Sequence, residues 1–376
     1  MTKPRLHTGL RLLASAGALA LLAAGVLTAP GQTAAAAPDT GYGATTAPAD
    51  YEGFVGQFNM FGSVGHYGQA EDIVWAIGSS VRDRGPLALA LQEVCENQIE
   101  ALADDLKGYG YVFEPAWAES ADSADPDNGN REPARCRDVP GQEAKGEVPP
   151  RYGNAVLIQE GHGFSAQGDA GVGRFDLGST NVTEYRSMVC TPSDELAMAV
   201  CSTHLTNGQD KEAETTREGE VQEAADRIRD NYDAGSVVLG ADLNMEPNEA
   251  SMSSLYHPDY YSTLLGPDAG QGYLRELMSE CGNEMNFVCR GGASTFGAVH
   301  GGTGQRTAEP DRQYDYLFAT PNVQVTDSRV TQPSQNCANP AHGVLREDVD
   351  PRLASNEFIS CSDHEILWAR ISVNSP

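Results

Sequence analysis

Polar residues suited to metal and phosphate chemistry recur in seven short motifs along this chain. In order they are QFNM at Asn59, LQEV at Glu93, YRSMV at Arg186, STHL at His204, GADLN at Asp242 and Asn244, YDYLF at Asp315, and SDH at Asp363 and His364. Carboxylate and amide oxygens are ligands for a hard divalent cation such as Mg²⁺, whereas His and Arg serve proton transfer and phosphate charge. The set therefore predicts a metal site that cleaves phosphodiester bonds.

Most of these residues stand at or just beyond the end of a short apolar run. Residues 87–91 precede Glu93, and residues 237–239 precede Asp242. Short apolar runs of this length are typical of buried strands. We therefore expect the polar residues to gather along one rim of a sheet core, which is a usual place for chemistry.

Alternating and apolar segments predict strands, and helical spacing of apolar residues predicts helices. The strands are expected over 54–58, 87–91, 154–158, 184–189, 196–203, 237–239, 316–319, 323–330 and 366–371, and the helices over 69–82, 97–106 and 212–232. Asn97 is the expected cap of the second helix. The strands at 184–189 and 196–203 should be antiparallel neighbours. The mixed order of hairpins and helical crossovers favours two packed mixed sheets covered by helices.

The ordered motif set resembles the endonuclease/exonuclease/phosphatase superfamily, which includes deoxyribonuclease-I-like nucleases, bacterial sphingomyelinases and inositol polyphosphate phosphatases. The match runs from about residue 54 to residue 371. The resemblance implies an α/β fold, a four-layer sandwich of two mixed, mostly antiparallel β-sheets flanked by helices. One departure is GADLN, because many members have GDFN or GDLN, without a counterpart of Ala241. This residue should move only the strand end.

The resemblance also assigns the metal ligands and the groups that act on water. Glu93 is the principal metal ligand it implies, with Asn59 supporting metal or phosphate and Asp363 as a second carboxylate on the metal side. Asp242 matches the residue that positions or activates the attacking water, and Asn244 matches the one that holds this Asp or the phosphate. Extended spacing would turn the side chains of Asp242 and Asn244 to the same side. The alternative is an Asx turn after a strand.

Two histidines and an arginine complete the implied catalytic set. His364 matches the histidine that contacts the scissile phosphate, and Asp315 matches the carboxylate that fixes its tautomer and raises its basicity. His204 matches the other histidine of the family. The alternative interpretation is that His204 is a structural residue at a strand end. Arg186 matches an arginine that grips phosphate, since its planar fork can hold two oxygens. An outward-facing strand arginine is the competing interpretation.

The first 37 residues are typical of a secretory signal. Lys3, Arg5 and Arg11 precede an apolar stretch over 12–26, and small residues follow at 33–37. The stretch is shorter than the roughly 18–20 residues of a spanning helix, so we expect cleavage, release to the extracellular space and no transmembrane segment. Residues 38–52 form the expected flexible lead-in, and residues 53–376 the expected single domain.

The mature chain should be strongly acidic. Removal of the three signal cations leaves 22 Lys and Arg against 53 Asp and Glu, a net charge of −31. This charge argues against tight, sequence-specific DNA binding, which depends on many cationic contacts. It does not exclude an enzyme that touches few phosphates in the presence of divalent cations.

Eight cysteines in an exported protein predict disulfides rather than metal thiolates. Cys190 and Cys201 flank a turn-like segment between two strand-like runs, so they can face each other across a hairpin. The other pairs we predict are Cys95 with Cys136, Cys281 with Cys289 and Cys337 with Cys361. Only the pair Cys190–Cys201 has a local geometric reason.

The function predicted from these observations is a secreted, monomeric, Mg²⁺-dependent phosphodiesterase, a nuclease acting non-specifically on DNA. Mn²⁺ and Ca²⁺ are the alternative ions. The main alternative activity is a sphingomyelinase or phospholipase C acting on phospholipids, which should show an exposed apolar hairpin; the sequence shows no clear one. A phosphatase of inositol phosphates would need a strongly basic pocket. A non-catalytic binding or toxin-like protein is disfavoured because the motif set is intact.

Overall fold

The structure is a computed structural model, and all the residues it describes belong to the unit Thr40–Pro376. They are 51–63, 68, 70–122, 132–133, 135–136, 149–165, 171–179, 184–232, 235–262, 264–266, 269–279, 288–292, 294–296, 312–331, 362 and 364–373. The predicted signal and most of the lead-in lie outside this part of the chain. The boundaries 1–37, 38–52 and 53–376 therefore stay predictions.

One six-stranded sheet contains both ends of the described chain. Its order is β16-β17-β1-β2-β6-β3. The strands are β1 (Tyr51–Asn59), β2 (Ala88–Cys95), β3 (Phe113–Glu119), β6 (Tyr152–Gln159), β16 (Val323–Thr331) and β17 (Ile366–Val373). β1 and β2 are parallel, and the other neighbours are antiparallel.

The second six-stranded sheet has the order β13-β15-β11-β10-β9-β7. Its strands are β7 (Gly173–Asp176), β9 (Ser187–Ser193), β10 (Met198–His204), β11 (Ser236–Asp242), β13 (Arg275–Glu276) and β15 (Asp315–Ala319). Here β10 and β11 form the parallel pair. Short strands make two small sheets, β5-β4-β8 and β12-β14. They are β4 (Ala121–Asp122), β5 (Glu132–Pro133), β8 (Glu184–Tyr185), β12 (Tyr260–Tyr261) and β14 (Val288–Cys289).

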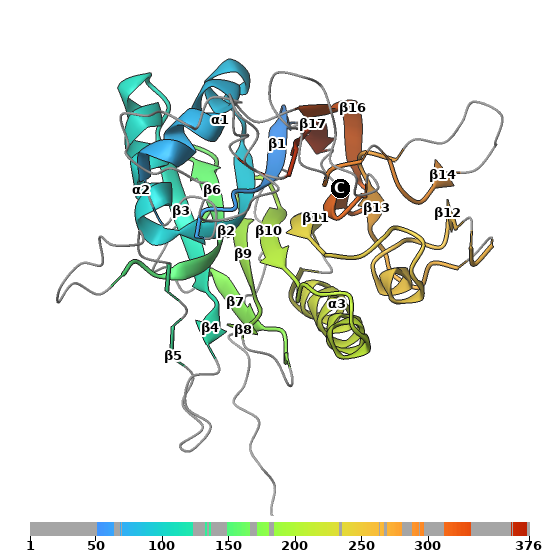
Figure 1. The fold of residues 1–376 in the computed structure, drawn as a ribbon. Helices are drawn as coiled ribbons and strands as arrows, with labels where there is room; N and C mark the ends of the chain where they lie inside the picture. Colours follow the sequence, from blue (N-terminus) through green and yellow to red (C-terminus); the bar gives the residue numbers. More distant parts are fainter. Residues whose placement is uncertain are drawn as a thin grey trace, which may run out of the picture. The chain divides into compact units, whose positions relative to one another are not determined.

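Helices cover the outer face of each large sheet (Figure 1). They are α1 (Ala70–Arg84), α2 (Glu96–Gly108), α3 (Lys211–Tyr232) and the 3₁₀ helix η1 (Ala250–Ser254). Ile77 of α1 and Leu102 of α2 share a buried cluster with Trp368 of the first sheet, and Val221 of α3 packs in a cluster with Leu239 of the second. This arrangement confirms the predicted four-layer sandwich of two mixed, mostly antiparallel sheets. No helix of the described segments is long and apolar enough to cross a membrane.

The core between the sheets follows from alternation along the strands. Val238 of β11 packs in the inter-sheet cluster, whereas its neighbour Leu239 packs toward α3. Gly240 then allows the sheets to approach closely, because a Cβ there would lie 2.5 Å from Cβ of Ala90 in β2. The β11–β15 register is unbroken through Ala241, which pairs with Tyr316. The extra residue of GADLN is thus an ordinary strand residue.

Two predicted elements differ in detail from the structure, and strand β3 was not predicted. Helix α2 begins earlier than expected, with Cys95 as its N-cap, and Asn97 instead donates from Nδ2 to the Gly68 carbonyl at 2.7 Å. The expected strand 184–189 is interrupted at Arg186, which lies between β8 and β9. Strand β3 was not predicted because Pro115 weakens the strand pattern of its sequence, but β3 is an edge strand, where proline is tolerated.

Both disulfides that the structure describes were predicted. Cys190 and Cys201 are directly opposite on β9 and β10, with Cα atoms 4.0 Å apart. Cys95 and Cys136 are bonded with Cα atoms 6.1 Å apart. These two pairs are confirmed. Cys281, Cys337 and Cys361 lie outside the described residues, so the pairs Cys281–Cys289 and Cys337–Cys361 stay predictions.

Candidate active site

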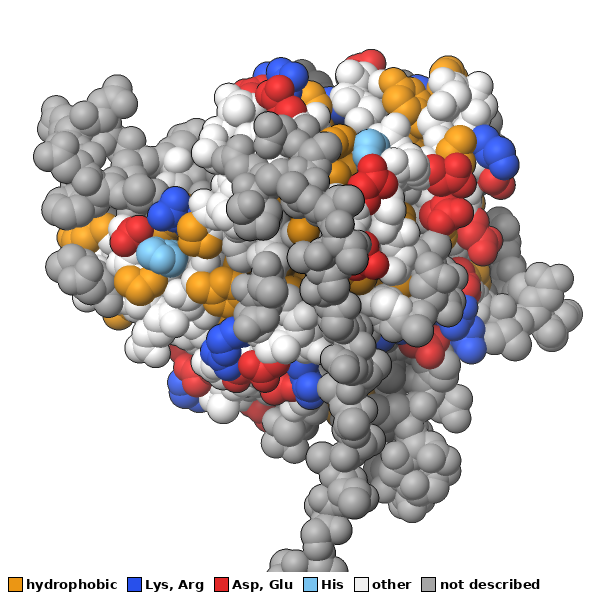
Figure 2. Space-filling model, turned by 180° about the vertical axis from the view of Figure 1, so that it is seen from behind, with side chains coloured by type: hydrophobic (Ala, Val, Ile, Leu, Met, Phe, Trp, Pro, Cys, Tyr) orange, Lys and Arg blue, Asp and Glu red, His pale blue; other side chains and the backbone are white. Residues whose placement is uncertain are grey.

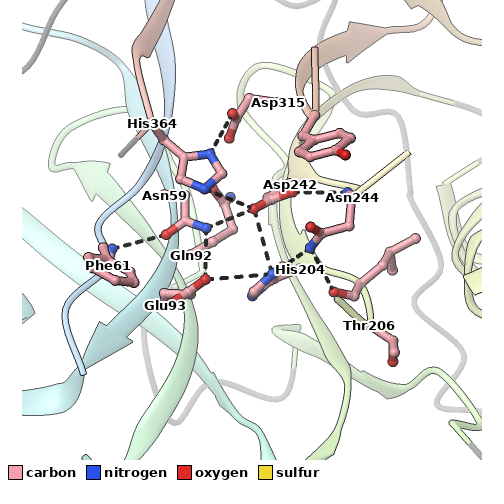
Figure 3. A network of polar contacts seen from close by, with 12 residues as sticks. Asn59, Phe61, Gln92, Glu93, His204, Thr206, Asp242, Asn244, Asp315 and His364 are labelled. Atoms are coloured by element: carbon pink, nitrogen blue, oxygen red, sulfur yellow. Dashed lines mark hydrogen bonds and ion pairs between the residues drawn. The ribbon is translucent and has the colours of Figure 1, made fainter. Parts of the chain in front are cut away.

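The predicted site residues meet where strands of both sheets end (Figure 3). Asn59 is the last residue of β1, His204 of β10 and Asp242 of β11, while Asp315 is the first of β15. Asp242 is paired with His204 on one side and with Asp315 on the other. His364 lies just before β17. Strand register alone therefore aligns three of these residues in one row of the second sheet.

Unusual backbone conformations surround this point. Only four non-glycine residues of the described segments have positive φ, and three of them, Phe61, Glu93 and Asn244, are at the site with φ of 51°. At Glu93 the pairing of β2 with β6 shifts its register between Leu91 and Val94. Such conformations cost about 1–3 kcal/mol each and persist where surrounding contacts impose them. They aim Glu93 and Asn244 toward the other site residues.

Asp242 lies at the centre of the contacts in Figure 3. Its Oδ2 accepts a hydrogen bond from Asn59 Nδ2 at 2.8 Å, and Nε2 of both His204 and His364 lies 3.6 Å from the same oxygen. The carboxylate is almost fully buried. Any group that binds beside Oδ2 is therefore in reach of both histidines.

The amide of Asn59 is fixed in one orientation. Its Oδ1 accepts from the backbone N–H of Phe61 at 3.0 Å, so Nδ2 faces the carboxylates. Nδ2 donates to Glu93 Oε1 at 3.1 Å as well as to Asp242. In this arrangement Asn59 presents nitrogen rather than oxygen to the centre. Its direct effect is to draw the two carboxylates together, and a role as metal ligand would require release of the Phe61 N–H.

Burial raises the pKa of Asp242 to about 7. The nearby carboxylates of Asp315 and Glu93 act in the same direction, whereas His364 and the Asn59 hydrogen bond oppose them. A carboxyl group with a pKa near neutrality can exchange a proton at physiological pH. It also gains most from a bound cation, which stabilises its ionised form.

His364 is held in place by the buried carboxylate of Asp315. Its Nδ1 lies 2.7 Å from Asp315 Oδ2. Asp315 is completely buried, and its other oxygen accepts from Gln57 Nε2 at 2.8 Å. A carboxylate only accepts, so Nδ1 carries the proton and Nε2 presents a lone pair toward Asp242. The ring of Phe296 packs beside His364 with centroids 5.0 Å apart.

His204 has a different neighbour. Arg186 is buried, and its Nη1 lies 3.0 Å from His204 Nδ1 and 2.9 Å from Glu184 Oε1. Burial lowers the pKa of His204 well below its usual value, and the positive charge of Arg186 lowers it further. Arg186 is thus neither an outward-facing strand residue nor exposed beside the carboxylates. It lies behind the ring of His204.

Asn244 reaches the site by a turn, so the expected extended spacing was wrong. Its backbone N–H donates to Asp242 Oδ1 at 3.0 Å, which is an Asx turn. The positive φ that accompanies the turn carries the side chain to His204 Nε2, 3.0 Å from Nδ2. The turn and the site contact therefore coexist at these two residues.

Two overlapping groups in the described residues have the composition of a metal site. Ligand atoms of Glu93, His204 and Asp242 lie within 4.8 Å of one another, and so do those of Asp242, Asp315 and His364. Two carboxylates that share one amide donor repel each other unless a cation or proton lies between them. The donor set therefore fits a divalent cation. Asp363, the third predicted ligand, lies outside the described residues.

Two buried glutamines beneath the site were not predicted. Gln57 Nε2 donates to Gln92 Oε1 at 2.8 Å as well as to Asp315, and Gln92 Nε2 donates to Ser202 Oγ at 2.9 Å. All of these side chains are inaccessible to solvent. Gln57 precedes Asn59 by two residues on a strand, so both point to one face. That alternation was the available signal.

No family model and no curated protein matches this sequence. Solved structures do match its fold. An endonuclease/exonuclease/phosphatase from Beutenbergia cavernae superposes with a TM-score of 0.51 at 18% identity, covering 86% of this chain and 72% of that one. D. rerio TDP2 complexed with a single-strand DNA product superposes with a TM-score of 0.52 at 10% identity, covering 86% and 99%. The chain therefore has the deoxyribonuclease-I-like fold of these proteins, which confirms the predicted fold.

Proposed function

We propose that the protein is a secreted, divalent-metal-dependent phosphodiesterase that acts as a nuclease on DNA. The observation that carries the proposal is the convergence of Glu93, Asp242, His204 and His364 at one end of both sheets. Two carboxylates and two histidines brought together from four separate strands or strand ends serve no purpose in the core. A buried polar cluster of this kind, with a perturbed carboxyl pKa, is typical of a catalytic site.

The same residues fit a divalent cation, and Mg²⁺ suits oxygen donors best. Glu93 would hold the cation, because this carboxylate is 14% exposed. It also lies close to Asp242, since both carboxylates accept a hydrogen bond from Asn59 Nδ2. Asp363 is the further carboxylate we propose from the motif, next to His364. The role we assign to Asn59 is to orient the carboxylates of Glu93 and Asp242. A bound cation would supply positive charge against the phosphate and the leaving oxygen.

The residues of this chain divide the remaining work of hydrolysis. Asp242 orients a water molecule and accepts its proton, since its pKa of about 7 leaves a useful ionised fraction at neutral pH. His364, oriented by Asp315, faces the same position through Nε2. His204 faces it from the other side, and Asn244 holds the ring of His204 in place. Water then attacks the phosphorus in line and the opposite P–O bond breaks, without a covalent enzyme intermediate. The leaving oxygen takes up a proton from solvent.

DNA is the substrate we favour. One structure of the same fold is D. rerio TDP2 in complex with a single-strand DNA product, which shows that this scaffold can accept a DNA strand in that protein. The mature charge of −31 implies few phosphate contacts and no sequence preference. Export is supported by the signal-like residues 1–37 and by two disulfides in the described chain.

A direct test is hydrolysis of plasmid DNA and of sphingomyelin vesicles by the purified mature protein in Mg²⁺. The His364→Ala variant removes a proposed catalytic ring, and His257→Ala is the matched control, because His257 is partly exposed beside Asp259. We expect nicking of DNA by the wild type and the control but not by His364→Ala. Equal nicking by all three proteins would refute the assignment of His364, and no cleavage of either substrate would refute the proposed function.

One observation favours phospholipid as the second candidate substrate. Leu264 and Leu265 expose 78% and 44% of their surface on a tight turn closed by two hydrogen bonds between the backbones of Ser262 and Gly266. Such a turn can insert apolar side chains into a lipid surface. If phosphocholine is released from vesicles while DNA stays intact, Leu264→Glu should abolish that release. The same variant should leave DNA nicking unchanged if DNA is the substrate.

A further inference from the structure

The two histidines of the candidate site face partners of opposite hydrogen-bonding character. Asp315 Oδ2 lies 2.7 Å from His364 Nδ1, whereas Arg186 Nη1 lies 3.0 Å from His204 Nδ1. A carboxylate can only accept a hydrogen bond, and a guanidinium can only donate one. The proton of His364 is therefore on Nδ1. On His204, Nδ1 must accept, so the proton of the neutral ring is on Nε2.

We propose that Arg186 is a positioning residue that fixes His204 as a hydrogen-bond donor, so that its Nε2–H binds a phosphoryl oxygen of the substrate. This rests on the proposed phosphodiesterase function. The two rings then differ in role, because His364 presents a lone pair to the same space in which His204 presents a hydrogen. Arg186 acts through His204 and does not itself hold the phosphate.

The surroundings of Arg186 hold it in this position. Its backbone N–H donates to Ser179 Oγ at 3.0 Å, and that hydroxyl donates to the buried Glu220 at 2.5 Å. Glu184 accepts from the same Nη1 that faces His204. The side chains of Arg186 and His204 are 4% and 3% exposed, so the contact between them is shielded from water.

The inferred tautomer has a consequence for Asn244. As placed, Asn244 Nδ2 lies 3.0 Å from His204 Nε2 and 3.2 Å from the Leu205 carbonyl. One neutral ring cannot accept from both Arg186 and Asn244. Asn244 Nδ2 therefore donates to the Leu205 carbonyl, at 3.2 Å, and not to Nε2 of His204. The Arg186 contact is the fixed one, since a guanidinium has no alternative role.

Nitrogen NMR of the histidine rings tests the tautomer without reference to activity. In protein with ¹⁵N-labelled histidine, we expect the wild-type ring of His204 to carry its proton on Nε2, with the signal assigned by its loss in His204→Asn. Arg186→Met should shift His204 toward a mixture of tautomers, and Arg186→Lys, which keeps a donor, should restore Nε2–H. A wild-type His204 protonated on Nδ1 would overturn the proposal, as would an unchanged tautomer in folded Arg186→Met.

Kinetics separate positioning from direct phosphate binding. On a small phosphodiester at saturating Mg²⁺, we expect Arg186→Met to lower kcat by about 10- to 100-fold with KM nearly unchanged, as for a misplaced hydrogen-bond donor. Arg186→Lys should recover part of kcat. The control Arg229→Met, on the exposed face of α3, should change neither constant. A rise in KM with kcat unchanged would mean that Arg186 grips the phosphate. Inactivity of the wild type would refute the proposed function instead, and the NMR result would still stand.

Discussion

Replacement of Gln57 by methionine removes the donor that joins the two sheets beneath the site. Gln57 Nε2 bonds the buried Asp315 Oδ1 and Gln92 Oε1, both at 2.8 Å. Leaving a buried charged oxygen without a donor costs about 3 kcal/mol, and leaving a neutral one costs about 2 kcal/mol. Gln57 Oε1 has no partner, so its removal recovers about 2 kcal/mol. The net loss of unfolding free energy should be about 3 kcal/mol.

The activity of Gln57→Met should fall as well, because Asp315 orients His364. We expect kcat on a small phosphodiester to drop about 10- to 100-fold, with little change in KM since Gln57 lies below the site. Denaturant unfolding measures the stability term, and Gln222→Met on the exposed face of α3 is the control. If Gln57→Met unfolds at the wild-type midpoint and keeps its kcat, the hydrogen bonds across the sheets do not hold Asp315.

Two further predictions concern stability. Without a divalent cation the raised pKa of Asp242 favours the folded state at acid pH, and this contribution is lost as pH rises from its unfolded value near 4 through about 7. Excess Mg²⁺ should therefore raise the melting temperature more at about pH 8 than at about pH 5.5. At a hundredfold excess over Kd, the ion adds about 2.7 kcal/mol to the unfolding free energy. An equal shift at both pH values would contradict a cation on Asp242. Replacement of both Cys190 and Cys201 by alanine opens a loop with a sequence separation of 11 and should lower the unfolding free energy by about 3 kcal/mol, as measured by chemical denaturation.

The arrangement of the site was largely predictable from the sequence because strand ends carry it. The apolar runs before Glu93 and Asp242 located β2 and β11, and the parallel and antiparallel registers then align His204, Asp242 and Asp315. The layers of the fold were predictable for the same reason, since the helices and the buried strands have clear periodicities.

Other features depend on contacts that no local pattern encodes. The orientation of the Asn59 amide is set by the backbone N–H of Phe61, and Arg186 reaches Nδ1 of His204 only because the strand is interrupted at that residue. Asn244 reaches the site because its φ is positive. Asparagine tolerates this conformation, but its presence in the sequence does not indicate that the conformation is adopted. Strand β3 was missed because Pro115 lowers the strand signal of this segment. The position of β3 at the sheet edge, which makes the proline tolerable, depends on tertiary structure.

The central claim is that Glu93 and its neighbours bind a divalent cation that phosphodiester cleavage requires. The most direct measurement is calorimetric titration of the mature protein and its Glu93→Gln variant with Mn²⁺, alongside hydrolysis of a small phosphodiester by the same samples. We predict that the wild type binds the ion and is active, and that a chelator abolishes its activity. Glu93→Gln should lose both properties while keeping its circular dichroism spectrum. Full activity of Glu93→Gln, or of the wild type in excess chelator, would contradict the account.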